Sequence, residues 1–565
     1  MQKKSNNNIK ICFMTVPVRD APTTFPPLGV TRMIDSLTDS GFEYQKNTFF
    51  YNTDLIRPSD DDLIKYFKEL KPNIIGISAV VSTSYSFVKR ISKKLKECMP
   101  EVDIVLGGNL AAASEVLLKK TSVDLCVIGE GEDSIIELCH HWGEFKSLKS
   151  NDELKLIKGL TFPESSERDK IFFTGYRQQI NKGSIRQANY KILDEYYLST
   201  GNLGTGFDSD PRLLEIIKQG KKTAGIELSK GCVSRCTFCH RWNKGYRVMD
   251  LDKIMANIKM LMEDYDVGIL DLYDENFGAN KQHIRDFCER IKPLNILWHV
   301  SGMRVKTVAD RSILHVMKDA GCISIKFGME SGSDRMLKIM EKLSTSVADN
   351  YNALLALKET GLLGTTTIQL VMGMPGENRQ TLKETYDFVQ KCKKFTGKVN
   401  VAASLAQALP GTPLFEFARA HKYIGSQIED EEEYLIRVSD KDKSDFSHYL
   451  NMTEESTPEV LYWQYLLRSE HYSFYEGSRG KLKYLLTVLL KVILTPFGFK
   501  NFIKVLLAYR YSNKDWSKTL GLFKEKRKEG LNLKTKSLRK TVLDIAPDFK
   551  KVDIPYSVDV IRAGR

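Results

Sequence analysis

Short apolar segments rich in β-branched residues alternate with amphipathic segments along two long stretches of this chain. The first stretch has such segments at residues 9–14, 74–78, 102–106 and 125–128. The second has them at residues 223–228, 268–273, 297–300, 324–327, 366–371 and 399–403. Short strands separated by helices favour parallel sheets with helices packed on them. We therefore predict an α/β fold for most of the chain.

The two stretches predict two different sheets. Residues 1–145 suit an open, doubly wound sheet of the Rossmann-like kind, which binds ligands at the carboxyl ends of its strands. Residues 221–425 hold six β/α units, too few for an eight-stranded barrel, and suit an open partial (β/α)6 barrel. A mixed connector is expected at residues 146–220. A mostly helical, basic domain is expected at residues 426–565.

Three cysteines follow the first strand of the second stretch, so we expect them in a loop at the carboxyl edge. They are Cys232, Cys236 and Cys239, and three such thiols can ligate three corners of an iron–sulfur cube. The fourth iron is then open to a small molecule. A zinc site usually needs a fourth ligand from a second Cys or His pair. His240 is adjacent, but no matching pair follows at the spacing of a zinc knuckle.

This C-x3-C-x2-C spacing, with an aromatic residue before the last cysteine, resembles the radical S-adenosylmethionine (SAM) superfamily. The resemblance implies a 4Fe–4S cluster whose open iron binds SAM, and an electron that cleaves SAM to a 5′-deoxyadenosyl radical. Residues 273–277, 328–333, 372–377 and 410–413 match further family motifs, in order and each at a strand end. The implied SAM-binding residues are Phe238, Asp274, Glu275, Asn276, Glu330, Ser331, Gly373 and Pro375.

The residue types agree with these roles but leave alternatives. A carboxylate at Asp274 or Glu275 could accept hydrogen bonds from the SAM ammonium, or could stabilise a helix N-terminus. Arg304 follows the third strand, where it could meet a carboxylate of a ligand or pair with a structural acid.

Two glycine-rich turns follow strands of the first stretch. Glycine there can end a strand or allow a ligand to approach the backbone closely. With residues 26–29, these turns resemble the N-terminal cobalamin-binding domain of one large radical SAM class. The resemblance implies cobalamin contacts at Gly107, Gly108, Asn109, Gly129, Glu130 and Gly131.

The chain contains no Asp-x-His-x-x-Gly motif, which supplies the lower cobalt ligand in many other cobalamin proteins. We therefore expect cobalamin to bind without a protein histidine on cobalt. The alternative is a domain that has lost the cofactor and is purely structural.

The resemblance implies a cobalamin-dependent radical SAM methyltransferase that acts on an unactivated carbon, or on phosphorus. Its substrate would be a small molecule, a peptide or a lipid, and its external electron donor a flavodoxin- or ferredoxin-like protein. The sequence names no catalytic residue beyond the cofactor ligands. A cyclase or coupling enzyme of the same class is the alternative within the family.

Two further alternatives belong to other classes. A tRNA-modifying methylthiotransferase would need a second cluster, for which Cys12, Cys98 and Cys126 would have to serve as ligands. A non-catalytic cobalamin-binding sensor would not need the intact cysteine triplet. Because the end of the chain reads as helical and not as a nucleic-acid-binding barrel, we do not expect a nucleic acid partner.

The positive charge lies in one segment. Residues 481–540 contain 16 Lys and Arg against Asp515, Glu525 and Glu529, which equals the net charge of +13 of the whole chain. Pro496 and interspersed lysines argue against a transmembrane helix here. A basic amphipathic pair of helices could contact a membrane surface, an anionic substrate or nucleic acid. The alternative is a helical cap with a solvated basic face.

The remaining cysteines fall singly, in apolar stretches where buried free thiols are expected. This pattern is typical of a reducing compartment. The first eight residues are polar and lack the apolar core of a signal peptide. We therefore expect a cytoplasmic protein, with membrane association as an option that the basic segment leaves open.

Overall fold

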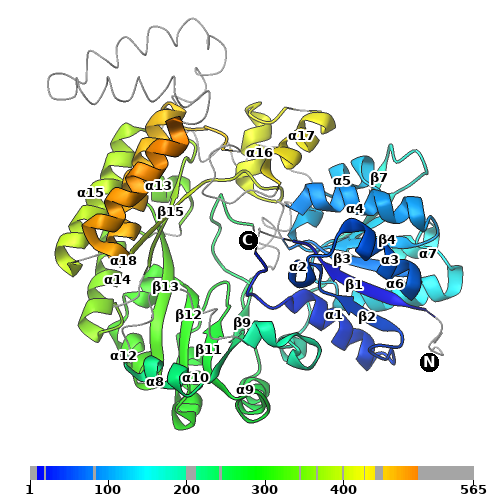
Figure 1. The fold of residues 1–565 in the computed structure, drawn as a ribbon, viewed down its shortest axis with the longest axis horizontal. Coiled ribbons are helices and arrows are strands. Elements are labelled where there is room, and N and C mark those ends of the chain that lie inside the picture. Colours follow the sequence, from blue (N-terminus) through cyan, green and yellow to red (C-terminus); the bar gives the residue numbers. More distant parts are fainter. Residues whose placement is uncertain are drawn as a thin grey trace, which may run out of the picture.

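The structure, a computed structural model, arranges the chain in two α/β units with helices closing one side (Figure 1). The residues that it describes are 9–17, 21–80, 84–149, 151–198, 211–240, 245–342, 345–363, 367–397, 400–425, 427–439 and 449–493. Most of the basic segment at 481–540 therefore lies outside the described residues.

The first unit is a seven-stranded sheet with the order β2-β1-β3-β4-β5-β6-β7. The first five strands in sequence are parallel, and β6 and β7 continue the sheet antiparallel. The strands are β1 Ile11–Thr15, β2 Thr48–Tyr51, β3 Ile74–Ser78, β4 Asp103–Gly107, β5 Leu125–Val127, β6 Leu160–Pro163 and β7 Ile171–Phe173.

Helices cover both faces of this sheet, as the doubly wound prediction requires. Cys12 and Met14 of β1 face a core that contains Ile91 of α4, whereas Ile11 faces the core that contains Ile34 of α1. This alternation is the period of two that a strand imposes on its side chains. The helices are α1 Leu28–Asp39, α2 Thr53–Ile56, α3 Asp60–Leu70, α4 Tyr85–Cys98, α5 Ser114–Lys120, α6 Glu132–Phe145 and α7 Asp152–Leu156.

The sheet extends beyond residue 145, where we expected the first domain to end. Strands β6 and β7 come from the predicted connector, and β2 was not predicted either. All three strands are only three or four residues long. Such short, partly exposed segments carry too little hydrophobic periodicity to be recognised in the sequence.

The second unit is a six-stranded parallel sheet with the order β15-β14-β13-β12-β11-β8. Strands β8 and β15 form its two edges, so the barrel is open, and the six strands match the six predicted β/α units. They are β8 Lys222–Ile226, β11 Val267–Leu272, β12 Leu297–Met303, β13 Cys322–Glu330, β14 Thr367–Met372 and β15 Asn400–Leu405.

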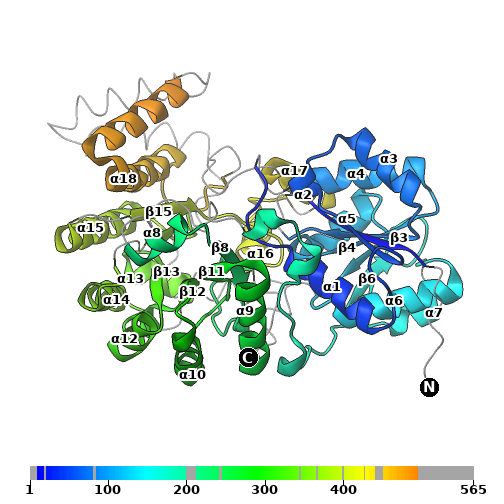
Figure 2. The ribbon, with the colours of Figure 1, turned by 60° about the horizontal axis from the view of Figure 1, so that its bottom comes forward.

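Helices wrap the outside of this open barrel (Figure 2). They pack on the outward-facing residues of the strands, such as Leu270, Leu272 and Trp298, which alternate with inward-facing ones. The helices are α9 Leu251–Tyr265, α10 Lys281–Ile291, α11 Val305–Val308, α12 Arg311–Asp319, α13 Asp334–Ile339, α14 Val347–Thr360 and α15 Arg379–Thr396.

Helix α8, Pro211–Lys218, covers the opposite, inner face at the amino ends of the strands. Leu213 packs there against Ile269 of β11, Leu297 of β12 and Ile323 of β13. The amino end of the barrel is thus filled by apolar side chains, which leaves the carboxyl end for a ligand.

The chain after β15 is helical, as predicted, in the part that the structure describes. It forms α16 Pro413–Ala420, α17 Ile428–Val438 and α18 Thr457–Ile493, with a kink in α18 at Gly477. Helix α18 lies along the edge strand β15, where the Gln464 side chain donates a 3.3 Å hydrogen bond to the carbonyl of Ala403. A helix at this position covers an otherwise open sheet edge.

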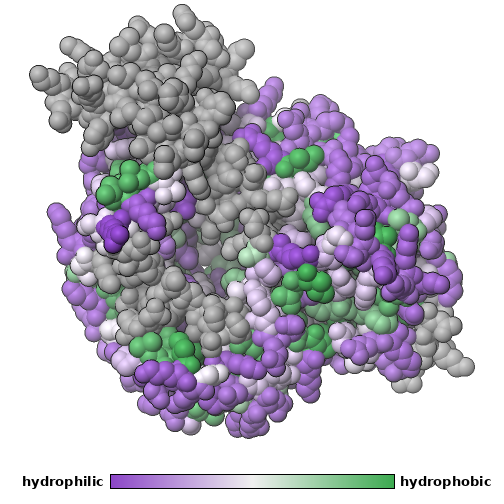
Figure 3. Space-filling model, viewed as in Figure 1, coloured by the Kyte–Doolittle hydropathy of each residue, from purple (hydrophilic) through white to green (hydrophobic). Residues whose placement is uncertain are grey.

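The surface seen in Figure 3 is mostly hydrophilic, with small, separate hydrophobic patches. Among the residues that the structure describes, no helix is both long and apolar enough to cross a membrane. The predicted membrane contact through 481–540 falls mainly on residues outside the described ranges.

We predict that Leu213→Ala destabilises the barrel. The side chain is fully buried, and replacing a buried leucine by alanine typically costs about 2–5 kcal/mol because a cavity remains. The neighbouring Leu214 is 39% exposed, so Leu214→Ala is a matched control that should change stability by less than about 0.5 kcal/mol. Calorimetric unfolding should show a lower transition temperature for the first variant alone. Equal transitions would mean that α8 does not seal the barrel.

Candidate functional site

The carboxyl edges of the two sheets face each other (Figure 1). Phe25, in the loop after β1, contacts Tyr273 at the end of β11 with 4.8 Å between ring centroids. Gly411, after β15, lies against His240 and Ala112, because a Cβ at Gly411 would come within 2.9 Å of both side chains. Loops from both units therefore meet at one junction, which is where ligands of parallel α/β sheets bind.

The cysteine triplet lies at this junction. Strands β9 Ser229–Lys230 and β10 Arg247–Val248 pair antiparallel and form the neck of a loop that contains all three cysteines. Cys236 is buried, and Cys232 is half-buried. Cys239 is exposed as a residue, yet the pKa of its thiol is raised to about 12, mainly by removal from water and by the other two cysteines.

Two helices hold the cysteine loop. The backbone N–H of Thr237 donates to the carbonyl of Met340 after α13, and the carbonyl of Thr237 accepts from Leu414 of α16 at 2.9 Å. Within the described residues, no three acidic, cysteine or histidine side chains are close enough to hold one metal ion. A cube offers a separate iron to each thiol, so three nearby but non-converging thiols remain compatible with it.

The two carboxylates in the acidic segment after β11 have different surroundings. Asp274 is buried and accepts hydrogen bonds from Ser229 and from the backbone of Leu228, so its carboxylate braces the start of the cysteine loop. Burial raises its pKa to about 7. Glu275 is exposed, and its charge acts on the Cys239 thiol. Of the two carboxylates, Glu275 is therefore better placed to accept a ligand ammonium beside the cysteines.

Asn276 is fully buried, and neither atom of its amide has a hydrogen-bond partner in the described part of the chain. Buried polar groups are nearly always satisfied, so an unsatisfied amide in a predicted SAM-binding segment is what a site for a missing polar ligand would leave. This observation fits the prediction that Asn276 contacts SAM.

Glu330 ends β13 in a left-handed backbone conformation, with φ of 63°. Its carboxylate folds back over Gly328, where a Cβ would lie 2.1 Å from Oε1, and it pairs with the half-buried Lys342. Burial opposes the charge of Lys342, but Glu330 and the thiols of Cys236 and Cys239 raise its pKa. Lys342 therefore places a cation beside the cysteines. The sequence motifs did not predict this residue.

Ser331 is bound into the scaffold. Its hydroxyl lies 3.0 Å from that of Thr385 on α15, and it accepts from the backbone N–H of Ser333. Asn350 of α14 donates to the carbonyl of Ser331. The predicted SAM residue Ser331 thus shapes the turn after β13 through hydrogen bonds that are already satisfied.

The glycine-rich turn after β14 closes around a buried acid. Gly373 has a φ of +85°, and a Cβ there would meet the Tyr449 hydroxyl. Glu377 is 1% exposed and accepts a hydrogen bond from the backbone of Gly373. Burial raises the pKa of Glu377 to about 8. The predicted residue Pro375 lies between these two, at the same edge as the cysteine loop.

The glycines of the first unit also divide into two kinds. At Gly107 and at Gly129, whose φ is +90°, a Cβ would meet no atom within 4 Å, so the backbone borders open space. Gly108 lies so close to the Ala79 carbonyl that a Cβ would be 2.5 Å away, and Gly131 packs against Met33 of α1. Open backbone at Gly107 and Gly129 is what a cobalamin cradle requires.

The other two predicted cobalamin residues differ in their surroundings. Asn109 begins a short 3₁₀ turn after β4 and is half-buried. Glu130 is engaged in ion pairs with Lys230 and Arg247 of the cysteine-loop neck. A second buried ion pair, Arg32 with Glu227, also joins the two units.

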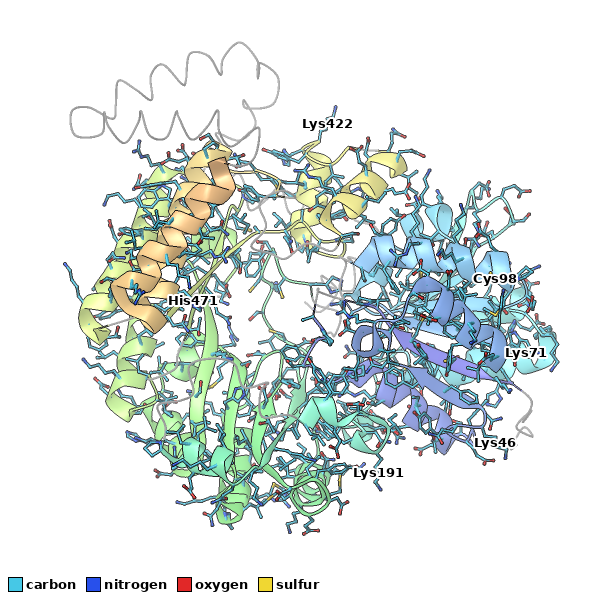
Figure 4. All side chains as sticks on the ribbon, viewed as in Figure 1. Lys46, Lys71, Cys98, Lys191, Lys422 and His471 are labelled. Atoms are coloured by element: carbon cyan, nitrogen blue, oxygen red, sulfur yellow. The ribbon has the colours of Figure 1, made fainter. Side chains whose placement is uncertain are left out.

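The other cysteines do not form a second site in the described structure. Cys12 and Cys126 are fully buried in the apolar core of the first sheet. Cys98 is exposed at the end of α4, far from the junction (Figure 4). The expectation of a buried thiol was wrong for Cys98. It follows the buried residues Ile91 and Leu95 at helical spacing, but it is the last residue of α4 and is left exposed at the helix end.

Glu377 should make the stability of the protein depend on pH. Its pKa lies near 8 in the folded state against an ordinary 4.5, so the folded protein keeps a proton that the unfolded chain releases. Stability should therefore fall as pH rises from about 4.5 to about 8. In Glu377→Gln this decline should be smaller, as melting at pH 6 and pH 8 would reveal. Glu384→Gln, on α15, controls for the lost charge. Equal declines in all three proteins would contradict the buried state of Glu377.

Two family models match the chain. The model described as "Radical SAM superfamily" matches residues 226–389, and the model described as "B12 binding domain" matches residues 14–138. The first match implies a 4Fe–4S cluster and SAM, and the second supports cobalamin. These are the cofactors that the sequence predicted.

Curated relatives are distant. An anaerobic magnesium-protoporphyrin IX monomethyl ester cyclase of Rubrivivax gelatinosus is 25% identical over 64% of this chain and 61% of that protein. The chain thus spans less than two thirds of this relative. A cytidylyl-2-hydroxyethylphosphonate methyltransferase of Streptomyces wedmorensis is 22% identical over 75% of this chain and 82% of that protein.

A solved structure shares the fold along nearly the whole chain. The cobalamin-dependent SAM radical enzyme OxsB, with aqua-cobalamin and SAM bound, covers 96% of this chain and 79% of its own, with a TM-score of 0.58 and 17% identity. The chain therefore joins a B12 binding domain to a radical SAM domain, and it belongs to the cobalamin-binding class of the radical SAM superfamily.

Proposed function

We propose that this protein is a cobalamin-dependent radical SAM methyltransferase. The observation that carries the proposal is the junction itself, where loops from the carboxyl edges of both sheets touch. Phe25 reaches Tyr273, and Ala112 and His240 meet at Gly411. Two cofactor sites on facing edges can act on one substrate held between them, because positioning reactants together lowers the barrier to their reaction.

Each edge would bind its own cofactor. Cys232, Cys236 and Cys239 would hold the cluster, and Glu275 would accept the SAM ammonium. Open backbone at Gly107 and Gly129 would line cobalamin, with no protein histidine on cobalt. When bound, the cluster supplies the electron that cleaves SAM to a 5′-deoxyadenosyl radical, and cobalamin supplies the methyl group.

The inner face of the barrel would hold the substrate. Asp271 and His299 alternate along their strands with residues of the outer core, so they face inward, and their side chains lie 3.2 Å apart. Gln369 alternates in the same way on β14. Arg304 follows Met303 of the outer core, and its side chain has no ion pair or hydrogen bond within the described residues. A polar interior with a cation at its mouth favours a polar substrate.

A cyclase or coupling reaction is the second candidate. The similarity to a magnesium-protoporphyrin IX monomethyl ester cyclase supports it, and the similarity to a phosphonate methyltransferase supports methyl transfer. Because this chain is similar to both relatives, the products of turnover must distinguish the two reactions. An external flavodoxin- or ferredoxin-like electron donor is part of either proposal.

The products of turnover test the function. The reconstituted and reduced protein should convert SAM to 5′-deoxyadenosine, and with its substrate should also form S-adenosylhomocysteine in equal amount, because one SAM supplies the radical and another the methyl group. Liquid chromatography with mass spectrometry measures both products. 5′-Deoxyadenosine with substrate but without S-adenosylhomocysteine would favour the cyclase or coupling enzyme. No cleavage of SAM would favour a sensor.

The cluster is tested separately. Anaerobic reconstitution should give about four irons per chain with charge-transfer absorbance, and Cys236→Ala should abolish both, because three thiols are the minimum for this site. Cys98→Ala, an exposed cysteine far from the junction, is the matched control and should retain full iron. A Cys236→Ala protein that keeps its iron would contradict the assignment of the triplet.

A further inference from the structure

The carboxylate of Glu130, in the turn after β5, binds cations of the second unit. The Glu130 side chain is only 6% exposed. Its Oε1 atom lies 2.8 Å from Nζ of Lys230 and 2.6 Å from Nη2 of Arg247. Its Oε2 atom accepts a 2.7 Å hydrogen bond from the backbone N–H of Ile180. Both carboxylate oxygens are thus engaged by the other side of the junction, and little of the side chain is left for cobalamin.

The two cations that bind Glu130 lie in the neck of the cysteine loop. Lys230 of β9 and Arg247 of β10 are directly opposite each other in the neck of the cysteine loop. Like charges that face each other across an antiparallel pair destabilise it, and both side chains are at most 15% exposed, so water screens them poorly. The Glu130 carboxylate pairs with both cations and so offsets their mutual repulsion. The neck is therefore held closed by an anion that the first domain provides.

Burial opposes the charge of Glu130, but Arg247 and Lys230 outweigh it and lower the pKa of Glu130 to about 2. The carboxylate is charged at neutral pH. A second acid of the same segment, Glu132, lies 3.8 Å from Lys230 and is too distant to replace it as a hydrogen-bond partner.

The same turn also borders the predicted cobalamin site. Gly129, directly before Glu130, has the open backbone described above. Consecutive Cα atoms are about 3.8 Å apart, so a ligand that settles on Gly129 fixes the backbone from which Glu130 reaches the neck. A movement of this turn would therefore shift the Glu130 carboxylate and, through its ion pairs, the neck of the cysteine loop.

We propose that Glu130 is a positioning residue that sets the cysteine loop against the cobalamin edge, so that the cluster and cobalamin each strengthen the binding of the other. This inference rests on the proposed presence of both cofactors, and it does not depend on which reaction they perform.

The affinity for hydroxocobalamin tests the coupling. Cluster-loaded wild-type protein should bind it at least about fivefold more tightly than cluster-free protein, as measured by absorbance titration. In Glu130→Gln the two affinities should be equal, although both cofactors still bind. Glu432→Gln is the matched control, because Glu432 is a half-buried acid that joins Lys89 of the first unit to α17, away from the cysteines. Its affinity ratio should equal that of the wild type.

Hydrogen exchange tests the neck without any cofactor. Backbone amides of residues 228–231 and 245–249 should exchange faster in Glu130→Gln than in the wild type or Glu432→Gln. The double variant Glu130→Gln, Lys230→Gln removes one of the facing cations, so it should regain protection of the neck but not the cobalamin coupling. If Glu130 only stabilised the neck, protection of the neck and the cobalamin coupling would return together in the double variant.

The outcomes distinguish the two proposals. Wild-type exchange in Glu130→Gln, or an unchanged affinity ratio in that variant, would overturn the positioning role. A wild-type protein that holds its cluster but binds no hydroxocobalamin would overturn both the coupling and the methyltransferase proposal. Coupling that is present while no S-adenosylhomocysteine forms would leave the positioning role intact and reject methyl transfer alone.

Discussion

The arrangement of this molecule depends on charged side chains buried where the carboxyl edges of its two sheets meet. Arg32 pairs there with Glu227, and Glu130 pairs with Lys230 and Arg247. Removing charges from water is costly, and the cost is recovered only with well-placed partners. Losing one partner of such a pair typically costs about 3–5 kcal/mol. These buried ion pairs therefore favour the arrangement in which the loops of the two carboxyl edges meet.

Several residues of the sequence motifs hold the scaffold around the junction. Asp274 braces the strand before the cysteines, Ser331 bonds to α15, and Glu130 closes the neck of the cysteine loop. Other groups at the same edges border open space or solvent, such as the backbone of Gly129 and the exposed side chain of Glu275. A motif at a site thus contains residues that contact ligands together with residues that hold them in place.

The fold could be predicted from the sequence where periodicity was strong. Strands that are buried on both faces leave continuous apolar runs, and the amphipathic helices between them imply parallel pairing. The prediction failed for short strands at the two ends of the first sheet and for one residue at a helix end. Strands β2, β6 and β7 are three or four residues long, and Cys98 is the exposed last residue of its helix. In both cases the local pattern carries too little information about burial.

The sequence by itself determined the fold class, the spacing of the three cysteines and the order of the loops at the strand ends, because these follow from local patterns of side chains. Only the tertiary structure decided which carboxylate meets which cation. Glu130 and Arg247 are 117 residues apart, and Lys342 reaches Glu330 from beyond a helix. A charged residue has the same local signal whether it is solvated or paired, and the difference arises only when folding removes the water around it.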